Sequence, residues 1–191
     1  ETVIPLRSIS MALGQGITAA RIAQISVPGP YAAAEAMKAL KAGMHAFVFS
    51  DNVPIEQEIV LKQLARKKGL LVMGPDCGTA IIAGVPMGFA NVVRRGAIGL
   101  VAASGTGLQE VSTQIHILGE GVSHAIGTGG RDLSEAVGGI TMLAALDTLG
   151  ADPATRVLVV ISKPPSARVT GVVLDKLRTI GKPAVVLFIG A

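Results

Sequence analysis

The chain has 191 residues, half of them hydrophobic, and a formal net charge of +4. No apolar run reaches the roughly 18 residues that a membrane-spanning helix needs, so we expect no membrane association. Aromatic residues make up only 3% of the chain, too few for the stacked rings that hold single-stranded nucleic acid. The basic residues are dispersed as on an ordinary solvated surface, and the mild positive charge also suits a small anionic ligand.

The single cysteine, Cys77, excludes an internal disulfide and fits a reducing cytoplasm, where we expect the protein to reside. The chain begins at Glu1 rather than at Met and stops just after a predicted strand. We therefore interpret it as part of a longer protein.

The first half of the chain alternates between short apolar runs and helical patterns. Residues 11–21 leave a helix and a loop both open, because glycines at 14 and 16 weaken the helical pattern. The pattern then predicts strands at 22–27, 44–49 and 70–73 and helices at 31–40 and 55–68. Residues 80–96 lack helical periodicity, and we interpret them as a crossing between two lobes.

The second half repeats this alternation, beginning with an apolar strand predicted at 97–103. A helix follows, and the spacing of Thr106 and Gln109 is that of a capping box at its start. The pattern also predicts strands at 122–126, 156–161 and 184–189 and helices at 140–149 and 167–180. Alternating strands and helices with short turns predict an α/β fold with parallel sheets, whose ligands bind at the carboxyl ends of the strands.

The turn Ser104-Gly105-Thr106-Gly107 lies between a predicted strand and a helix. A helix N-terminus presents unpaired backbone N–H groups that favour an anion, and glycines let a ligand approach the backbone. A second glycine-rich turn, at 127–132, also follows a predicted strand. Each turn taken alone fits an anion site and an ordinary strand-to-helix connection equally well. Both turns follow strands of a predicted parallel sheet and so lie at the same edge, which favours the anion site.

Single residues give weaker signals. No histidine lies near Cys77 in the sequence, so we interpret it as a small apolar residue rather than a nucleophile. Arg131 suits either an anion clamp or a surface salt bridge, and Asp132 suits a helix start. The histidines are interpreted as core, strand or solvated residues, and no spacing of ligand residues indicates a metal site.

Four motifs follow predicted strands: Val27-Pro28-Gly29-Pro30-Tyr31, Gly74-Pro75-Asp76-Cys77, Ser104-Gly105-Thr106 and Gly127-Thr128-Gly129-Gly130-Arg131-Asp132. Their order resembles the α subunit of succinyl-CoA synthetase, an ADP-forming acyl-CoA synthetase. The FdrA relatives of that subunit are more similar still, through the segments 49–53, 69–79, 89–91 and 161–165. The resemblance covers the chain from about residue 22 to its end.

This resemblance implies a Rossmann-like CoA-binding domain over residues 1–96 and a flavodoxin-like CoA-ligase domain over residues 97–191. It implies CoA contacts in the loops that match the synthetase, at Val27, Pro28, Gly29, Tyr31, Asp51, Asn52, Val53, Pro75, Asp76 and Cys77. In the synthetase, the loop matching Ser104 heads a helix that points at the phosphate of a phosphohistidine. Phosphate contacts are therefore expected at Ser104, Gly105, Thr106, Gly107, Thr128, Gly129 and Gly130.

The chain also departs from the synthetase pattern. Residues 1–21 show no match to its early glycine-rich CoA loop, and its phosphorylated histidine would fall after residue 191. Lys163 stands where the synthetase has a glutamate that holds this histidine. A lysine cannot accept a hydrogen bond from imidazole but favours a bound phosphate, so Lys163 is the candidate catalytic residue.

The resemblance thus suggests an acyl-CoA synthetase-like subunit that binds CoA, phosphate or both, and that acts on a small anionic substrate. Nucleotide would require a β-subunit-like partner or a further C-terminal domain, and we expect an oligomer. An alternative, implied by the FdrA relatives, is a carbamoyltransferase in which phosphate attacks oxalurate to give oxamate and carbamoyl phosphate. A non-catalytic module that senses CoA or a nucleotide is the remaining alternative.

Overall fold

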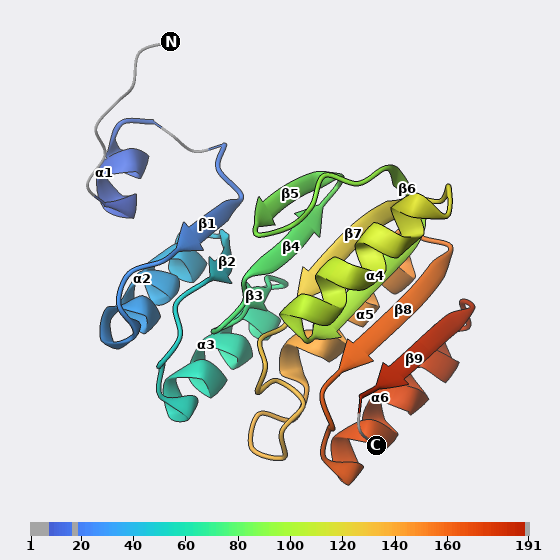
Figure 1. The fold of residues 1–191 in the computed structure, drawn as a ribbon. Coiled ribbons are helices and arrows are strands. Elements are labelled where there is room, and N and C mark those ends of the chain that lie inside the picture. The colour runs from blue at the N-terminus through green and yellow to red at the C-terminus, as the bar shows by residue number, and fades with distance from the viewer. Residues whose placement is uncertain (1–7, 17–18, 190–191) are drawn as a thin grey trace.

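The computed structural model describes residues 8–16 and 19–189, which form two neighbouring β-sheets with helices packed around them (Figure 1). A short helix, α1 (Ile9–Gly14), precedes the sheets, so the first residues of the segment 11–21 are helical, while residues 17–18 of that segment lie outside the described residues. Within the described residues, no helix is both long and apolar enough to cross a bilayer.

Sheet A is parallel and has the strand order β1-β2-β3, with β1 (Ile22–Ile25), β2 (His45–Val48) and β3 (Val72–Met73). Helices α2 (Gly29–Lys41) and α3 (Ile55–Lys67) connect these strands and pack against each other. The buried face of α2 carries Ala32, Ala36, Ala39 and Leu40, at helical spacing. All these elements agree with the sequence prediction.

Sheet B has the order β5-β4-β7-β6-β8-β9. Its strands are β4 (Thr79–Ile82), β5 (Val85–Gly88), β6 (Arg95–Ala103), β7 (Val122–Gly127), β8 (Val157–Ser162) and β9 (Ala184–Phe188). The last four strands in this order are parallel, as predicted, whereas β4 is antiparallel to both β5 and β7. Sheet B is therefore mixed, which the expectation of parallel sheets missed.

The mixed part of sheet B is a hairpin at residues 79–88, which takes up the first part of the segment 80–96 that we interpreted as a crossing between two lobes. Its turn uses two residues with positive φ, Ala83 at 52° and Gly84 at 84°. Such a turn joins antiparallel strands well, but it normally carries asparagine or aspartate before the glycine. The alanine at position 83 removed the usual sequence signal for a hairpin.

Helices cover both faces of the parallel part of sheet B (Figure 1). Helix α4 (Gly105–Ile117) packs on one face through Leu108, against Leu100 and Ala102 of β6. Helices α5 (Ile140–Ala151) and α6 (Ala167–Ile180) pack on the other face, where β6 presents Val101 and Ala103. Successive side chains of β6 point to opposite faces of sheet B, and helices cover both faces. The sequence of β6 is therefore apolar along its buried length rather than alternating.

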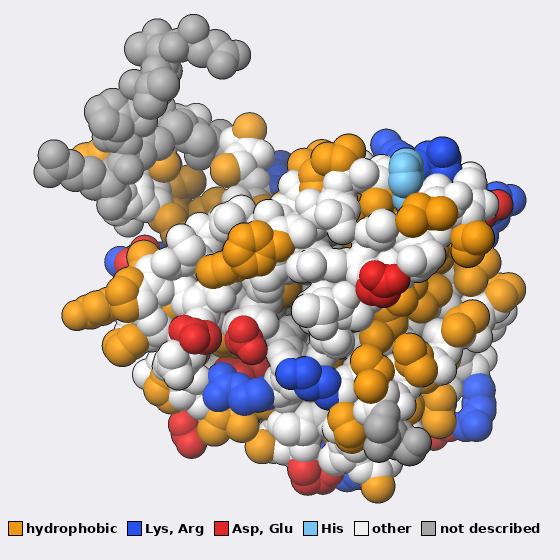
Figure 2. All heavy atoms as spheres, in the orientation of Figure 1, with side chains coloured by type: hydrophobic (Ala, Val, Ile, Leu, Met, Phe, Trp, Pro, Cys, Tyr) orange, Lys and Arg blue, Asp and Glu red, His pale blue; other side chains and the backbone are white. Residues whose placement is uncertain are grey.

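Strand β9 has one covered and one open face. Val186 and Phe188 pack into the core beneath α5 and α6, whereas Val185 and Leu187 are 60% and 51% exposed. Figure 2 shows hydrophobic side chains gathered over this side of the molecule.

The hydrophobic core continues from one sheet to the other. Phe47 and Met73 of sheet A share a buried cluster with Ala80 of β4 and Ile126 of β7. Helix α3 of the first sheet also contacts α5 of the second. This shared packing fixes the loops at the carboxyl ends of the two sheets beside each other.

Candidate functional site

The loops that follow β1, β2 and β3 contact one another at the carboxyl edge of sheet A. The Ser50 hydroxyl donates to the Val27 carbonyl at 2.5 Å, and the Asp76 backbone N–H donates to the Ser50 carbonyl at 3.0 Å. A Cβ atom on Gly29 would overlap the Asp51 carbonyl oxygen. These contacts bring the segments at 27–29, 50–51 and 76 together, as the predicted sheet edge requires.

A groove of about 510 Å³ lies over these loops, and we call it the Phe49–Phe89 groove. The two rings meet edge to face, with centroids 5.3 Å apart, and Phe89 is 66% exposed. The lining residues are Ser26, Val27, Pro28, Gly29, Phe49, Ser50, Asp51, Asp76, Gly78 and Phe89. The groove therefore combines an aromatic wall with backbone groups and two carboxylates.

The predicted CoA residues divide into those that line this groove and those that do not. Val27, Pro28, Gly29, Asp51 and Asp76 line it. Val53, Pro75 and Cys77 are buried and do not line the groove. Asn52 is exposed but also does not line it. The sequence prediction did not single out Phe49 and Phe89 as site residues, although their segments carried the resemblance.

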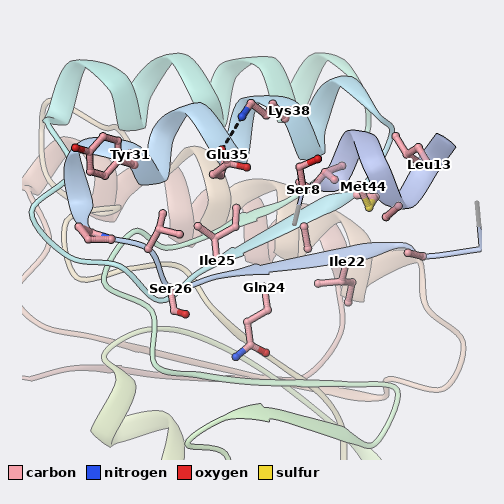
Figure 3. Close-up of a pocket in the computed structure, with 16 residues that line it drawn as sticks. Ser8, Leu13, Ile22, Gln24, Ile25, Ser26, Tyr31, Glu35, Lys38 and Met44 are labelled. Carbon is pink, nitrogen blue, oxygen red and sulfur yellow. Dashed lines mark hydrogen bonds and ion pairs between the residues drawn. The ribbon is translucent and has the colours of Figure 1, made fainter. Parts of the chain in front are cut away.

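Tyr31 and α1 lie against a larger cavity of about 800 Å³ beside β1 (Figure 3). Its lining is mainly apolar and includes Ile22, Ile25 and Met44, with a Glu35–Lys38 ion pair of 2.6 Å at its border. Val27 and Pro28 line both spaces. We assign the site to the smaller groove, because most of the predicted loops converge there.

The turn after β6 forms the N-terminus of α4, as predicted, but its cap differs from the expected one. The Ser104 hydroxyl accepts the Gly107 N–H at 3.3 Å, whereas Gln109 reaches away and donates to the Thr79 hydroxyl at 2.7 Å. The capping box of Thr106 and Gln109 is thus wrong, and Ser104 is the N-cap. The N–H groups of the first helical turn have no partner within the helix, which is the feature that favours an anion.

The two predicted phosphate turns meet below this helix end. Ser104, Gly105, Gly129 and Gly130 border a narrow space together with Asp76, Cys77, Ala102 and Gly127. Its volume is about 10 Å³, which is room for about one water molecule. A phosphate group would therefore sit at the mouth of this space, where Gly105 and Gly130 are exposed, and not inside it.

Most glycines of these turns serve the packing of loop on loop and not the approach of a ligand. A Cβ atom on Gly129 would overlap the Pro75 carbonyl, and one on Gly127 would overlap the Cys77 sulfur. Gly107 packs against Ile161. Of the glycines in the α4 turn, Gly105 alone has open space around its Cβ position. The expectation that the glycines of these turns let a ligand approach the backbone therefore fits Gly105, but it is wrong for Gly127 and Gly129.

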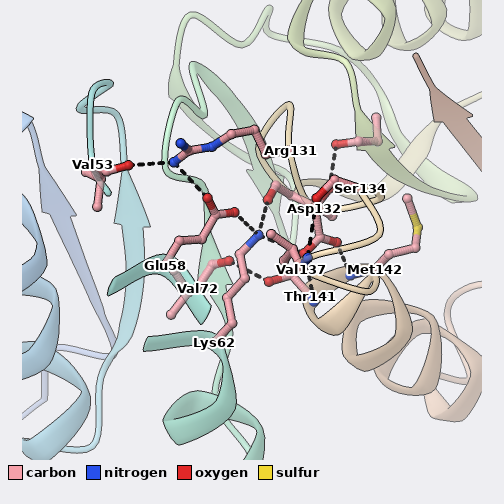
Figure 4. A network of polar contacts seen from close by, with 12 residues as sticks. Val53, Glu58, Lys62, Val72, Arg131, Asp132, Ser134, Val137, Thr141 and Met142 are labelled. Atoms are coloured by element: carbon pink, nitrogen blue, oxygen red, sulfur yellow. Dashed lines mark hydrogen bonds and ion pairs between the residues drawn. The ribbon is translucent and has the colours of Figure 1, made fainter. Parts of the chain in front are cut away.

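A buried charge network, absent from the sequence prediction, holds the second turn in place (Figure 4). The Lys62 side chain of α3 is fully buried, and its ammonium contacts Asp132 Oδ1 at 2.7 Å and Glu58 Oε1 at 2.8 Å. The same ammonium donates to the Thr128 carbonyl at 2.9 Å. Asp132 in turn accepts the N–H groups of Thr141 and Met142 at the start of α5, which confirms its predicted role at a helix start.

Arg131 completes this network from the exposed side. Its guanidinium contacts Glu58 Oε2 at 2.8 Å and donates to the Val53 carbonyl at 2.7 Å. Of the two interpretations of Arg131, the salt bridge is the one observed. Two buried acidic side chains thereby face two basic ones, and the network joins the loop after β2 to the turn after β7.

Lys163 follows the last residue of β8 and is exposed. Strand pairing sets Ser162 opposite Ala103, so the next residues along the two strands, Lys163 and Ser104, occupy neighbouring positions at the sheet edge. Lys163 therefore follows β8 at the same sheet edge that carries the N-terminus of α4.

Cys77 and the histidines play supporting roles. Burial raises the pKa of the Cys77 thiol to about 11, which fits the apolar interpretation rather than a nucleophile. His45, His116 and His124 each accept a backbone N–H through Nδ1 and border neither the groove nor the narrow space. Burial lowers the pKa of His45 and His124, so both favour the neutral form that such acceptance requires.

Comparison with known proteins gives a family match over the second half of the chain. A family model described as "CoA binding domain" matches residues 94–190. This range covers β6 to β9, whereas the resemblance assigned most CoA contacts to the loops of sheet A. The domain bounds at residues 96 and 97 therefore stay a prediction.

The chain is also similar to curated relatives and to solved structures. The chain is 55% identical to the uncharacterized protein YahF of Escherichia coli (strain K12) over 173 residues, which are 91% of this chain and 34% of YahF. It is 30% identical to the α subunit of ADP-forming succinate–CoA ligase of Aquifex aeolicus over 152 residues, 76% of this chain and 48% of that subunit. The ATP citrate lyase of Methanothrix soehngenii, solved with citrate and coenzyme A, has the same fold at a TM-score of 0.82 and 23% identity, over 97% of this chain and 32% of that one. The chain thus spans half or less of the length of these proteins.

Proposed function

The chain belongs to the CoA-binding domain family, and from this premise we propose that it binds CoA in the Phe49–Phe89 groove, as part of an ADP-forming acyl-CoA ligase-like enzyme. One observation carries the proposal. Asp76 lines both this groove and the narrow space at the N-terminus of α4, so the two spaces adjoin. An extended ligand lying in the groove would bring its end to the exposed N–H groups of the α4 turn.

The residues of the groove fit the arm of CoA that carries the thiol. This arm is long, flexible and uncharged, with two amides, and it matches a lining of aromatic carbon, backbone groups and oxygen acceptors. Val27, Pro28 and Gly29 would contact it from one side and Phe89 from the other. The thiol would then lie near Ser104 and Gly105, where the helix N-terminus stabilises an acyl phosphate or the charge that forms on its carbonyl oxygen.

The rest of such an enzyme would come from other parts of a longer chain or from a partner. The described residues hold two sheets with no further fold to bind a nucleotide, and the matched parts make up only 34% and 48% of the two relatives. We therefore propose that a β-subunit-like partner or another domain supplies the nucleotide, within an oligomer. The small anionic substrate would bind where this partner meets the α4 turn.

A second candidate function, an FdrA-type carbamoyltransferase, is favoured by the position of Lys163. An oxygen of inorganic phosphate would attack the carbamoyl carbon of oxalurate, the C–N bond would break, and the nitrogen would take a proton to leave as oxamate. Such phosphorolysis needs a held phosphate and no phosphohistidine. Lys163 and the α4 turn, adjacent at the edge of sheet B, would hold that phosphate.

Calorimetric titration of the chain with CoA tests the proposed binding. We expect saturable heat with the wild type and weaker binding after Phe89→Ala, which removes the exposed aromatic wall. The control is Val92→Ala, because Val92 is 83% exposed and lies outside the groove. Absence of heat and of a thermal shift at millimolar CoA would contradict the proposal.

Activity measured with the whole protein separates the two candidates. Formation of acyl-CoA from an acid, ATP and CoA supports the ligase, and phosphate-dependent carbamoyl phosphate from oxalurate supports the carbamoyltransferase. We expect Thr106→Val to lower whichever activity is present, since Thr106 lies exposed on the first turn of α4. CoA binding with neither activity would indicate a sensing module.

A further inference from the structure

Basic side chains gather at the amino end of sheet A, which is the end opposite the Phe49–Phe89 groove. One precedes β1, one ends α2, and three stand in a row at the end of α3. We call them the basic end of sheet A, and its exposed members are Arg21, Lys41, Arg66, Lys67 and Lys68. They are dispersed in the sequence, and the parallel order of the strands brings them to one end of the sheet.

The strand register shows that the segments of the basic end are neighbours. The His45 N–H donates to the Arg21 carbonyl at 2.8 Å, and the Ala46 N–H donates to the Leu71 carbonyl at 2.9 Å. The starts of β1, β2 and β3 are therefore level, with adjacent strands about 4.8 Å apart. Because α2 and α3 end shortly before β2 and β3, their basic last residues share one surface with Arg21.

This surface accounts for the whole net positive charge of the chain. The chain has 17 lysines and arginines and 13 aspartates and glutamates. Without the basic end, 12 basic residues remain against 13 acidic ones, so the rest of the chain is close to neutral. The C-terminal dipoles of α2 and α3 offset only about one unit of the charge at the basic end.

The basic end also lacks acidic partners. None of its side chains forms an ion pair with a described residue. Basic residues elsewhere do so, as Lys62 does with Asp132 and Arg178 does with Asp175. The like charges at the basic end therefore repel one another without compensation from the described part of the chain, which favours an anionic partner.

Several kinds of anionic partner do not fit this surface. Its residues line neither the groove, nor the cavity beside β1, nor the narrow space at the α4 turn, so no hollow there encloses a small ligand. Segments 39–43 and 64–70 carry no aromatic residue for stacking nucleic-acid bases. None of their large hydrophobic side chains is exposed, so nothing there would insert into a bilayer.

An acidic polypeptide fits the basic end better than the backbone of a DNA duplex does. Both α2 and α3 end here, and the last carbonyl groups of a helix have no partner within it. A polypeptide supplies N–H donors for such carbonyls, whereas a phosphodiester has no donor. Carboxylates of the same polypeptide would pair with the basic side chains.

We propose that the basic end of sheet A docks an acidic polypeptide surface of a partner protein. This inference is independent of the proposed CoA binding, because the groove lies at the other end of the strands. Strand β2 has four residues, so the two ends of the sheet are about 13 Å apart. A partner held at the basic end therefore leaves the groove and the α4 turn open to their ligands.

A triple variant in α3 tests the surface, and a triple variant in α6 is its matched control. The α3 variant is Arg66→Gln, Lys67→Gln and Lys68→Gln, all at exposed positions where glutamine retains a good helix propensity. The α6 variant removes the same charge through Arg168→Gln, Lys176→Gln and Arg178→Gln. Each of these control residues pairs with a carboxylate at the surface.

The measurement is fluorescence anisotropy of labelled deca-glutamate titrated with the full chain. We expect saturable binding in about 50 mM salt and much weaker binding in about 300 mM salt, since exposed charges are screened. At about twofold for each exposed ion pair, the α3 variant should weaken binding about eightfold. The α6 variant should leave binding unchanged. A second variant of the basic end, Arg21→Gln with Lys41→Gln, should weaken binding about fourfold.

Three outcomes would overturn the proposal. Equal losses of affinity in the α3 and α6 variants would show that net charge alone governs binding. Absence of binding by the wild type at the lower salt concentration would show that the surface does not recognise acidic polypeptide. A short DNA duplex that binds more tightly than the peptide, and loses this binding in the α3 variant, would assign the surface to nucleic acid instead.

Discussion

Lys62 of α3 and Asp132 of the turn after β7 form an ion pair of 2.7 Å in which both side chains are completely buried. The pair joins the helical layer of sheet A to the turn that borders the candidate anion site. The Lys62 ammonium also donates to the Thr128 carbonyl, and the Asp132 carboxylate accepts two N–H groups of α5. One buried cation thereby fixes both the conformation of this turn and its position relative to the first sheet.

Replacement of Lys62 by methionine should destabilise the protein strongly. The variant retains most of the side-chain volume but leaves Asp132 and Glu58 buried with fewer partners, and removal of one member of a buried pair typically costs about 3–5 kcal/mol. Equilibrium unfolding in denaturant measures this loss. The control is Lys38→Met, which breaks a surface pair with Glu35 and should cost at most about 1 kcal/mol. Equal losses in the two variants would show that the buried network contributes no more than a surface pair.

Gly129→Ala should also destabilise the protein, independently of any ligand. Gly129 has φ of 86°, and a Cβ atom there would overlap the Pro75 carbonyl. Strain of this kind costs roughly 1–3 kcal/mol. In contrast, Gly171→Ala in α6 meets nothing within 4 Å and should stabilise the helix by about 0.5–1 kcal/mol. Thermal unfolding of both variants should therefore shift in opposite directions, and a stable Gly129→Ala protein would contradict the packing argument.

The sequence predicted most of the fold because local periodicity and turn residues dictate it. The strands at β1, β2, β6, β7, β8 and β9 and all the long helices lie where the apolar patterns placed them. The hairpin at 79–88 was missed because Ala83 occupies a turn position that asparagine or aspartate usually marks. The cap of α4 was misassigned because Gln109 finds a partner on β4, which lies far away in the sequence.

The candidate site was less predictable, since its geometry depends on contacts between distant segments. The sequence indicated that turns of the two sheets share an edge, but not that Gly127 and Gly129 are required for packing against residues 75–79. The i, i+4 spacing of Glu58 and Lys62 is typical of an exposed helical pair. Lys62 pairs with Asp132, 70 residues downstream, and Glu58 also pairs with Arg131. Because these partners are so distant in the sequence, only the fold identifies Glu58 and Lys62 as buried.

Cys77 should react slowly with alkylating reagents in the folded protein. Its thiol is buried, and its pKa is raised from 9.0 to about 11, so little reactive thiolate is present at neutral pH. Labelling with iodoacetamide at pH 7.5, followed by mass spectrometry, should be slow in buffer and rapid in denaturant. Because the unfolded thiol ionises at lower pH than the folded one, this residue should also favour unfolding as the pH rises from 9 towards 11. Rapid labelling of the folded protein would indicate that Cys77 is an accessible nucleophile.

Lys163→Glu should weaken the binding of phosphate if the carbamoyltransferase proposal holds. Lys163 neighbours Ser104 at the edge of sheet B, and its exposed ammonium is free to turn towards an anion at the α4 turn. Loss of a direct charged contact should cost ~1–3 kcal/mol, seen as a higher apparent KM for phosphate in carbamoyl phosphate formation by the whole protein. Lys68→Glu, an equal change of charge at the exposed end of α3, is the control and should leave this KM unchanged. If both variants raise KM equally, the effect arises from net charge alone and Lys163 does not contact phosphate. If neither variant changes KM, the lysine has no part in the site.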